Sequence, residues 1–330
     1  MAGSVEITPW HWVGFILCVL LFLALDLGLL NRRARTIPFR EAVAWSALWF
    51  ALAMAFAGAV AYGRGREEAI QFTTGYLIEL SLSLDNILVI ALVFAWFRVP
   101  REHQHRLLFW GILGALVMRG AMIGLGVELI NRFDWVLYLF GAFLLFAGVK
   151  MLLSGQTTVN PERNLALRLA RKLFAVSPDP DGQKFFTRLN GRRALTPLAV
   201  VLLIIETTDL IFALDSVPAV FSVTRNAFIV FTSNIFAILG LRSLYFLLVG
   251  ALDYFRYLKI GLSVVLVFIG VKMLIDPHGR PEPKGFQVEL PTSVSLMVVA
   301  TIIIIAIVLS VMVAEREKRT GAAGRQNHNH

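Results

Sequence analysis

Nine apolar stretches of roughly 20 residues recur along the chain, separated by shorter polar connections. A helix of about 20 residues crosses the roughly 30 Å of hydrocarbon in a bilayer, so this pattern predicts an all-α polytopic membrane protein. The predicted membrane helices are Trp10–Leu30, Ala42–Tyr62, Phe72–Phe97, Leu107–Leu129, Trp135–Leu153, Leu195–Val223, Phe228–Leu248, Leu258–Ile275 and Pro291–Ala314.

The composition agrees with a membrane protein and excludes a soluble one. Hydrophobic residues make up 57% of the chain, and its mean hydropathy is +0.72, well above the values of soluble domains. The first apolar stretch has no basic n-region and no small-residue cleavage pattern, so we predict an uncleaved helix rather than a signal peptide. The single cysteine, Cys18, excludes an intramolecular disulfide and a cysteine-based metal cage.

The net charge of +9 reports membrane topology, and we expect no nucleic-acid partner. With the N-terminus outside, 21 Lys and Arg residues fall on the inner side and 6 on the outer side. Because segments rich in Lys and Arg stay on the cytoplasmic side, this asymmetry predicts a multi-pass protein of the cell (inner) membrane. Its N-terminus is expected outside and its C-terminus in the cytoplasm.

The one long polar connection, residues 154–194, carries the stretch "PERNLALRLARKLF". In it Leu165, Leu169 and Leu173 recur every fourth residue opposite basic side chains. This spacing predicts a basic amphipathic helix that lies on the anionic headgroups of the bilayer, with docking of a soluble protein as the alternative. The stretch "SPDPDGQ" predicts a turn-rich linker, and residues 315–330 a solvated cytoplasmic tail.

A unit of three helices occurs twice. In the first helix of each unit an acidic residue is followed at the same spacing by an Asp and then a polar residue: Glu79, Asp85 and Asn86, then Asp209, Asp215 and Ser216. The second helices share "GALVMRG" and "AILGLRS", and the third share "FAGVKML" and "FIGVKML". Because each unit has an odd number of spans, the second unit enters the membrane from the opposite side, as in the inverted repeats of transporters. The predicted organisation is one membrane domain, 1–330, with repeats at 72–153 and 195–275 and a final helix at 291–314.

Acidic residues inside the predicted helices carry the functional hypothesis. At roughly 2.5 to 3.5 kcal/mol each, they oppose insertion by roughly 15 to 20 kcal/mol in total. Arg119 and Arg242, which align between the repeats, can form ion pairs with only two of them. The others remain to be balanced by protons or bound cations, as in an ion pathway. The six acids are Asp26, Glu79, Asp85, Glu206, Asp209 and Asp215.

Helical spacing predicts that some of these residues share a face. Glu79, Ser83 and Asn86 follow at i, i+4 and i+7 and form one polar stripe. Pro218 cannot donate a hydrogen bond to the carbonyl of the fourth residue before it, so we expect the helix to kink or open beside Asp215.

The available ligands are hard oxygen donors: carboxylates, an Asn amide, Ser or Thr hydroxyls and main-chain carbonyls. Such donors suit Mg²⁺, Ca²⁺ or Mn²⁺. The histidines His11, His103, His105 and His278 lie at helix ends or in connections, which disfavours a tetrahedral zinc site. The two arginines could bind an oxyanion, but the acids outnumber them, and we favour a role in tethering or gating the carboxylates.

At these residues the chain resembles the TerC family of integral membrane proteins, through "GYLIELSLSLDN", "IIETTDLIFALDSVPAVFSVT" and "TSNIFAILGLRSLYFLL". The resemblance implies metal-ion transport, with Mn²⁺ export first, beside an association with tellurium resistance. The family often has Lys where Leu80 stands, so a charge at that position is not required here. The ion-binding group that the resemblance implies is Glu79, Asp85, Asn86, Glu206, Asp209, Asp215 and Ser216, with Asp26 as a further member.

The sequence therefore predicts a membrane transporter that exports a divalent cation by alternating access, with proton exchange at the same carboxylates. We expect no enzymatic activity and no bound cofactor, the metal being the substrate. An intramembrane aspartyl protease would show a Gly-x-Gly-Asp pattern, which is absent from this sequence. A membrane scaffold, an insertion factor or a tellurium-resistance factor that recruits partners through the basic loop remains the alternative.

Overall fold

The computed structural model describes residues 7–25, 38–153, 168, 172, 174–177, 181–189, 191–249, 257–276, 288 and 290–326. Its helices are α1 (Pro9–Leu25), α2 (Phe39–Arg64), α3 (Arg66–Trp96), α4 (Arg101–Arg132), α5 (Trp135–Leu153), α7 (Pro197–Phe221), α8 (Ala227–Val249), α9 (Leu258–Ile275) and α10 (Thr292–Gln326). Eight of them are long and apolar enough to cross a membrane, and α1 is a shorter apolar helix. The all-α polytopic prediction is confirmed.

Polar end turns account for most differences between the predicted and observed helix bounds. Helix α3 begins at Arg66, before the predicted start at Phe72. Gly65, with φ of 103°, separates α2 from α3, and an ion pair between Arg64 and Glu68 bridges the break. Hydropathy misses such turns because they are charged although helical.

Helix α7 has a defined start and contains a proline. Thr196 accepts a hydrogen bond from the Ala199 N–H at 3.3 Å, and Pro197 occupies the first turn, a favourable combination of N-cap and N1 residue. The helix runs through Pro218 to Phe221. Since proline has no N–H, the carbonyl of Leu214 has no helical donor at that position.

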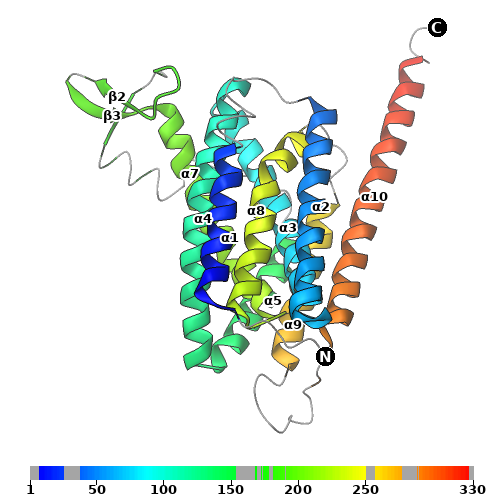
Figure 1. Ribbon diagram of the computed structural model, residues 1–330. Coiled ribbons are helices and arrows are strands. Elements are labelled where there is room, and N and C mark those ends of the chain that lie inside the picture. The colour runs from blue at the N-terminus through cyan, green and yellow to red at the C-terminus, as the bar shows by residue number, and fades with distance from the viewer. Residues whose placement is uncertain are drawn as a thin grey trace.

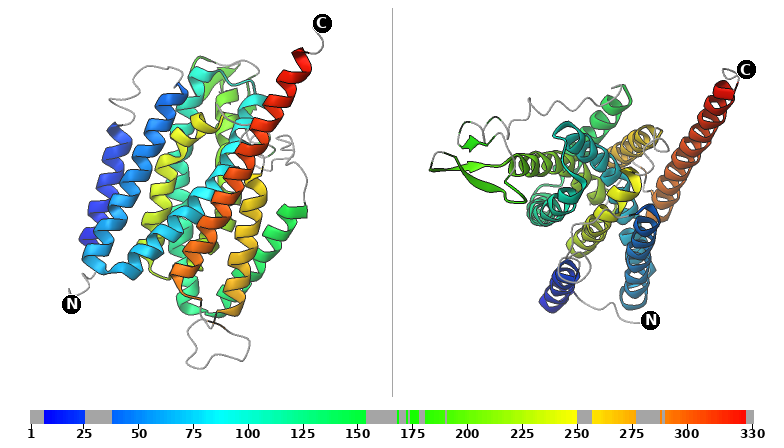
Figure 2. Two further views of the ribbon diagram at one scale, coloured as in Figure 1. Left: turned by 90° about the vertical axis from the view of Figure 1, so that its right-hand side faces the viewer. Right: turned by 90° about the horizontal axis from the view of Figure 1, so that it is seen from above.

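The helices form one elongated bundle in which α3 and α8 are the most enclosed (Figure 1). About 67% of the apolar window of α3 and 72% of that of α8 are buried, against 17% for both α2 and α10. Figure 2 shows α10 and α1 at the edge of the bundle. Polar residues on α3 and α8 are therefore largely enclosed by other helices.

Helices α3, α4 and α5 pack against α7, α8 and α9. Helices α3 and α7 run antiparallel, because Gly75 packs against Val220 while Asn86, further along α3, bonds to Asp209. Helix α3 of the first unit thus contacts α7 of the second at two separate points along its length.

The other two pairs of matching helices also run in opposite directions. On α5 and α9, Gly141 packs against Met273 and Gly148 against Val267. On α4 and α8, Gly120 packs against Phe231, while His105 at the start of α4 contacts Arg242 near the end of α8. All three matching pairs are therefore antiparallel.

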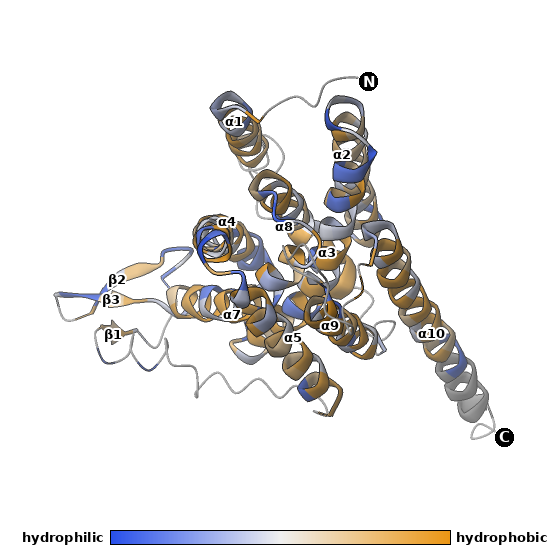
Figure 3. Cartoon of the chain, turned by 90° about the horizontal axis from the view of Figure 1, so that it is seen from below, coloured by the Kyte–Doolittle hydropathy of each residue, from blue (hydrophilic) through white to orange (hydrophobic). Residues whose placement is uncertain are grey.

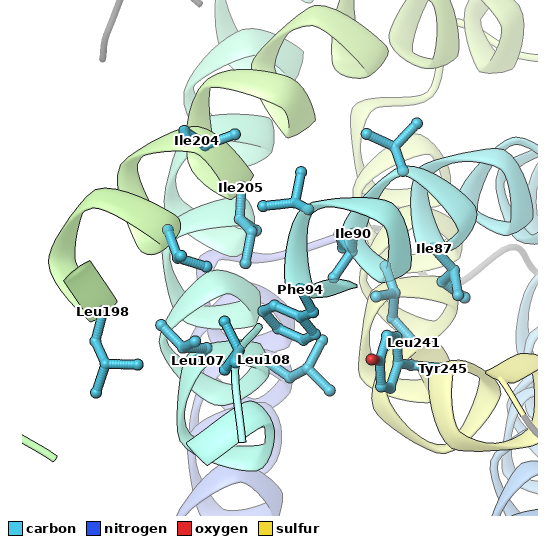
Figure 4. Packing of buried hydrophobic residues seen from close by; sticks show 14 of the residues in the cluster. Ile87, Ile90, Phe94, Leu107, Leu108, Leu198, Ile204, Ile205, Leu241 and Tyr245 are labelled. Atoms are coloured by element: carbon cyan, nitrogen blue, oxygen red, sulfur yellow. The ribbon is translucent and has the colours of Figure 1, made fainter. Parts of the chain in front are cut away.

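The described residues form four buried apolar clusters, of which two, called A and B, flank the candidate site. Cluster A draws most of its side chains from α3, α4, α7 and α8, as Figure 4 shows, and also includes Leu195 of β3 and Leu258 of α9. It includes Ile87, Ile90, Phe94, Leu107, Leu108, Leu198, Ile204, Ile205, Leu241 and Tyr245. Cluster B draws on the same four helices together with α5, α9 and α10, and includes Ile78, Leu82, Ile123, Val217, Val220, Val230, Leu266 and Val299.

The connection between α5 and α7 departs from the prediction, because it contains a small sheet rather than only a helix and a linker. Strand β3 (Arg192–Leu195) pairs with β1 (Ala175–Val176) in parallel and with β2 (Phe186–Leu189) antiparallel. The strands are only two to four residues long and lie in a basic stretch. The one sequence signal for them was Asn190-Gly191 between β2 and β3, a dipeptide typical of two-residue hairpins. The predicted amphipathic helix with Leu165, Leu169 and Leu173 lies outside the described residues.

A polar contact orders the turn before β2. The carboxylate of Asp181 accepts hydrogen bonds from Thr187 at 2.9 Å and from Lys184 at 3.3 Å. These bonds favour the ionised form and hold the pKa of the Asp181 carboxyl below its ordinary value.

Candidate functional site

Arg119 of α4 lies in the bundle interior between two acidic side chains. It is 1% exposed and forms an ion pair through Nη1 with Glu79 of α3, which is fully buried. Its Nη2 donates to Asp209 Oδ1 at 2.9 Å and its Nε to Oδ2 at 3.3 Å. A guanidinium and a carboxylate in this two-bond arrangement form a strong, oriented pair. One cation thus joins three helices.

Two further side chains extend this network. Asn86 of α3 donates from Nδ2 to Asp209 Oδ1 at 2.7 Å, and Arg119 Nη1 donates to Ser216 Oγ at 3.2 Å. Glu79 and Asp209 hold matching positions in the two repeats, as do Asn86 and Ser216. The structure therefore brings corresponding residues of both sequence motifs together.

These residues form a band that we call the polar layer: Glu79, Ser83, Asn86, Arg119, Asp209 and Ser216. It lies between the two apolar clusters. On α4, Leu108 of cluster A precedes Arg119 and Ile123 of cluster B follows it, and on α7 Asp209 comes after Ile205 and before Val217. Hydrophilic positions are visible between α4, α7 and α9 near the middle of the bundle (Figure 3). The polar layer is thus covered by apolar side chains towards both ends.

The polar layer has an excess of negative charge. With both carboxylates ionised, Glu79 and Asp209 outweigh the single guanidinium of Arg119 by one charge. A buried charge pair is tolerated only where attraction and hydrogen bonds offset the loss of hydration. The network supplies several such bonds to Asp209 and fewer to Glu79.

Three of the other predicted acids, Asp85, Glu206 and Asp215, lie near the polar layer and are partly exposed. The charge of Asp215 interacts with those of Asp85 and Lys150, and the charge of Glu206 interacts with that of Asp209. The carboxylate oxygens of Glu206 lie directly against Gly114 of α4. Asp85, Glu206 and Asp215 are therefore electrostatic neighbours of the network rather than part of the bonds around Arg119.

The described side chains do not form an acidic metal cage. Among the residues that the structure describes, no group of three or more Asp, Glu, His or Cys side chains could hold a metal ion. A small cavity of about 20 Å³ adjoins the polar layer, with Asn86 and Asp209 in its wall. Such a volume accommodates one water-sized object. A larger cavity of about 800 Å³ lies at the α3–α4 turn, away from the polar layer.

Comparisons with known proteins identify the family. A family model described as Integral membrane protein TerC family matches residues 64–318. The chain belongs to the TerC family. Its relatives include an uncharacterized membrane protein, STKORF319, of Myxococcus xanthus, with 50% identity over 92% of this chain and 93% of that protein. A putative membrane-bound redox modulator, Alx, of Escherichia coli K12 is 43% identical over 94% of this chain and 97% of that one. No solved structure matches the chain.

The TerC-family match covers all of the polar layer as well as α3 to α9. With eight long apolar helices among its described residues, this TerC-family protein is a multi-pass integral membrane protein. The name of the E. coli relative describes that protein, and its similarity to this chain extends over nearly the full length of both.

Arg242 has a different environment from Arg119, although the two align between the repeats. Its Nη1 lies 3.1 Å from His105 Nε2 of α4, near the end of the bundle, where it lines a small cavity with Trp45 and Trp49 of α2. Sequence alignment of the repeats could not show this difference, because it depends on which helices flank α8. Asp26, the remaining predicted site residue, lies outside the described residues.

Two interior positions of this TerC-family protein were not among the predicted site residues. Gly114 leaves room for the carboxylate of Glu206, and Asn234 of α8 is fully buried. The signal for Asn234 was the amide in the apolar stretch "TSNIFAILG". A single glycine in a membrane helix gives no such signal, because glycine is common in membrane helices.

Proposed function

We propose that this protein exports a divalent metal cation across the membrane, with Mn²⁺ as the first candidate. The observation that carries the proposal is the buried polar layer, in which carboxylates from both repeats meet between two apolar clusters. Its carboxylate, amide and hydroxyl oxygens are hard donors that suit Mn²⁺, Ca²⁺ and Mg²⁺. The choice of Mn²⁺ among these rests on the family resemblance.

Antiparallel packing of matching helices supports an alternating-access mechanism with repeats at residues 72–153 and 195–275. In transporters built from inverted repeats, one unit moves against the other around a central site, and each position exposes the site to one side. Here cluster A lies on the side of the α3–α4 turn and cluster B on the other. We propose that these clusters open in turn.

In this mechanism Arg119 competes with the divalent cation for the carboxylates of the polar layer. Glu79 and Asp209 carry two negative charges, which a divalent cation would balance if the guanidinium moved away. Because no acidic cage is present among the described residues, the cation must gain oxygen ligands as Arg119 leaves. After the cation is released, protons would bind the carboxylates while the site returns to the other side of the membrane.

The partly exposed acids suit a path into the polar layer. Asp85, Glu206 and Asp215 lie close enough to charged neighbours for their ionisation to matter. We propose that they pass the cation between solvent and the central carboxylates, with Asp26 as a further candidate. Anionic headgroups would contact the basic loop, with the N-terminus outside and the C-terminus in the cytoplasm of the cell.

Reconstitution of the purified protein in liposomes tests this function. Wild-type protein is expected to move Mn²⁺ unaided, and Asp85→Asn or Asp215→Asn to slow transport on the order of tenfold, because each removes a charge from the path. In cells challenged with Mn²⁺, the same variants should raise the intracellular metal content. Glu128→Gln is the matched control, since Glu128 is an exposed acid paired with Arg132 at the end of α4.

A wild-type protein that leaves Mn²⁺ on its original side of the liposome membrane would contradict the transport proposal. It would favour the alternative of a membrane scaffold, an insertion factor or a tellurium-resistance factor. In cells, a metal content that stays at the wild-type level while both Asp variants are expressed normally would also contradict the transport proposal.

Gly114→Ala provides a second test through the position of Glu206. The added methyl group would overlap the Glu206 carboxylate, which must swing aside. Since only a flexible side chain has to move, we expect stability to change by less than about 1.5 kcal/mol, while Mn²⁺ transport falls on the order of tenfold. Gly124→Ala on the same helix has nothing within 4 Å of the new atom and serves as control. Wild-type transport by Gly114→Ala would remove Glu206 from the path.

A further inference from the structure

Asn234 of α8 is an unusual residue in the bundle interior. It is fully buried, and neither its Nδ2 nor its Oδ1 has a hydrogen-bond partner among the described residues. Burial of an amide without partners is unfavourable, because the group loses its hydrogen bonds to water and gains none in return. Buried polar atoms in proteins nearly always have a partner, so such an atom calls for an explanation.

Its two neighbours in the sequence show how a buried polar side chain in this helix is normally satisfied. Thr232 Oγ1 donates to the Phe228 carbonyl at 2.7 Å, and Ser233 Oγ donates to the Val230 carbonyl at 3.1 Å. Both are fully buried as well. Asn234 is therefore the one of the three that the backbone of its own helix leaves unsatisfied.

The position of Asn234 on α8 places it at the level of the polar layer. Along α8 it lies between Val230, which belongs to cluster B, and Leu241, which belongs to cluster A. At 3.6 residues per turn, these three residues fall within about 40° of one another around the helix axis. Leu241 also lines the 20 Å³ cavity with Asn86 and Asp209. Asn234 thus faces the same interior as the acidic network.

Several oxygen atoms of the polar layer are also buried without a hydrogen-bond partner. Among the described residues, Ser83 Oγ, Asn86 Oδ1 and Glu79 Oε2 are buried and have no hydrogen-bond partner. All three belong to the polar stripe of α3, the helix against which α8 packs. Together with Asn234 Oδ1, these atoms are one carboxylate oxygen, two amide oxygens and one hydroxyl oxygen without a hydrogen-bond partner among the described residues, although the Glu79 carboxylate is paired with Arg119 and the Asn86 amide donates to Asp209. Such oxygens form an incomplete coordination set rather than a satisfied polar core.

We propose that Asn234 is a further ligand of the transported divalent cation and binds it through Oδ1, together with the unpartnered oxygens of α3. The inference rests on the proposed transport function and adds a fourth helix to the site. Hard divalent cations accept amide carbonyl oxygens alongside carboxylates. A neutral ligand from α8 raises the number of oxygens around the cation without adding charge to the two carboxylates, Glu79 and Asp209.

Asn234→Leu separates this role from a structural one. Leucine has nearly the same size and no polar atoms, so removal of two unpartnered groups should leave the metal-free melting temperature of purified protein unchanged or higher. Mn²⁺ binding, measured by the rise in melting temperature with added MnCl₂, should weaken on the order of tenfold. Transport in liposomes should fall with it. Potassium chloride at equal ionic strength controls for salt effects.

Two other substitutions complete the design. Asn234→Asp keeps an oxygen at the site and should retain Mn²⁺ binding, whereas Asn234→Ala should lose it as Asn234→Leu does and replaces that variant if it fails to fold. Thr232→Val is the matched control, because its hydroxyl is buried but bonded within α8. It should bind Mn²⁺ as the wild type does.

Each outcome decides the proposal. If the wild type binds and transports Mn²⁺ and Asn234→Leu does so equally well, the transport function stands and the assignment of Asn234 is wrong. A lower metal-free melting temperature with wild-type Mn²⁺ affinity also overturns it, and indicates that Asn234 holds a structural water. If the wild type neither binds nor transports Mn²⁺, both proposals fail.

Discussion

Arg119→Met is expected to destabilise the protein by about 3–5 kcal/mol, the usual effect of removing one partner from a buried charge pair. The change leaves Glu79 and Asp209 ionised or newly protonated in an interior where both are almost fully buried. Methionine fills a comparable length but supplies no donor. Thermal melting of purified protein in detergent, together with the yield of folded protein, measures the effect.

The triple variant Arg119→Met, Glu79→Gln, Asp209→Asn shows whether charge is the cause. With both acids made neutral, most of the lost stability should return, while Mn²⁺ transport should stay absent. Arg132→Met is the control, because Arg132 and its partner Glu128 are 70% and 60% exposed. An exposed ion pair contributes at most about 1 kcal/mol. Melting of Arg119→Met at the wild-type temperature would mean that the acids are not charged in the folded protein.

Gly270→Ala is expected to destabilise the contact between α5 and α9 by about 1–3 kcal/mol. A methyl group on Gly270 would lie 2.5 Å from the backbone nitrogen of Leu145 and 2.9 Å from the carbonyl oxygen of Gly141. Backbone atoms cannot turn aside as a side chain can, so the two helices must separate. Close approach at small residues is what holds helices together in a membrane, where apolar burial provides little driving force.

Gly58→Ala separates this effect from the general influence of glycine on helices. Gly58 lies inside α2, and an added methyl group there meets nothing within 4 Å. Alanine is the better helix former, so this variant should gain up to about 1 kcal/mol. Melting temperatures of the two variants should therefore move in opposite directions. A Gly270→Ala protein that melts as high as Gly58→Ala would show that α5 and α9 need not pack so closely.

The helices were predictable because each must supply about 20 apolar residues to cross the hydrocarbon, whatever its neighbours are. The charged first turn of α3 was missed for the same reason, since hydropathy reports only the part of a helix that lies in lipid. The small sheet around β3 was missed because its short strands are basic and lack a clear apolar alternation, although Asn190-Gly191 between β2 and β3 is a dipeptide typical of two-residue hairpins.

The residues of the polar layer were predictable in part, and their arrangement was not. Sequence identified Glu79, Asn86, Asp209 and Ser216 from the matching spacing of the two motifs, and the structure joins them through Arg119. It also gave Arg242 the same role as Arg119, whereas Arg242 contacts His105 near the end of the bundle. Repeats related by sequence need not have equal surroundings, because α1, α2 and α10 flank them unequally.

The sequence by itself determined that this is a membrane protein with two related three-helix units and acidic residues inside its spans, because hydropathy and spacing are properties of the chain alone. Only the tertiary structure decided that Glu79 and Asp209 share one arginine, that Asp85, Glu206 and Asp215 stand apart from it, and that Asn234 faces the same interior. The rotation of each helix about its axis and its closest neighbours fix these contacts, and both depend on packing between segments distant in the chain.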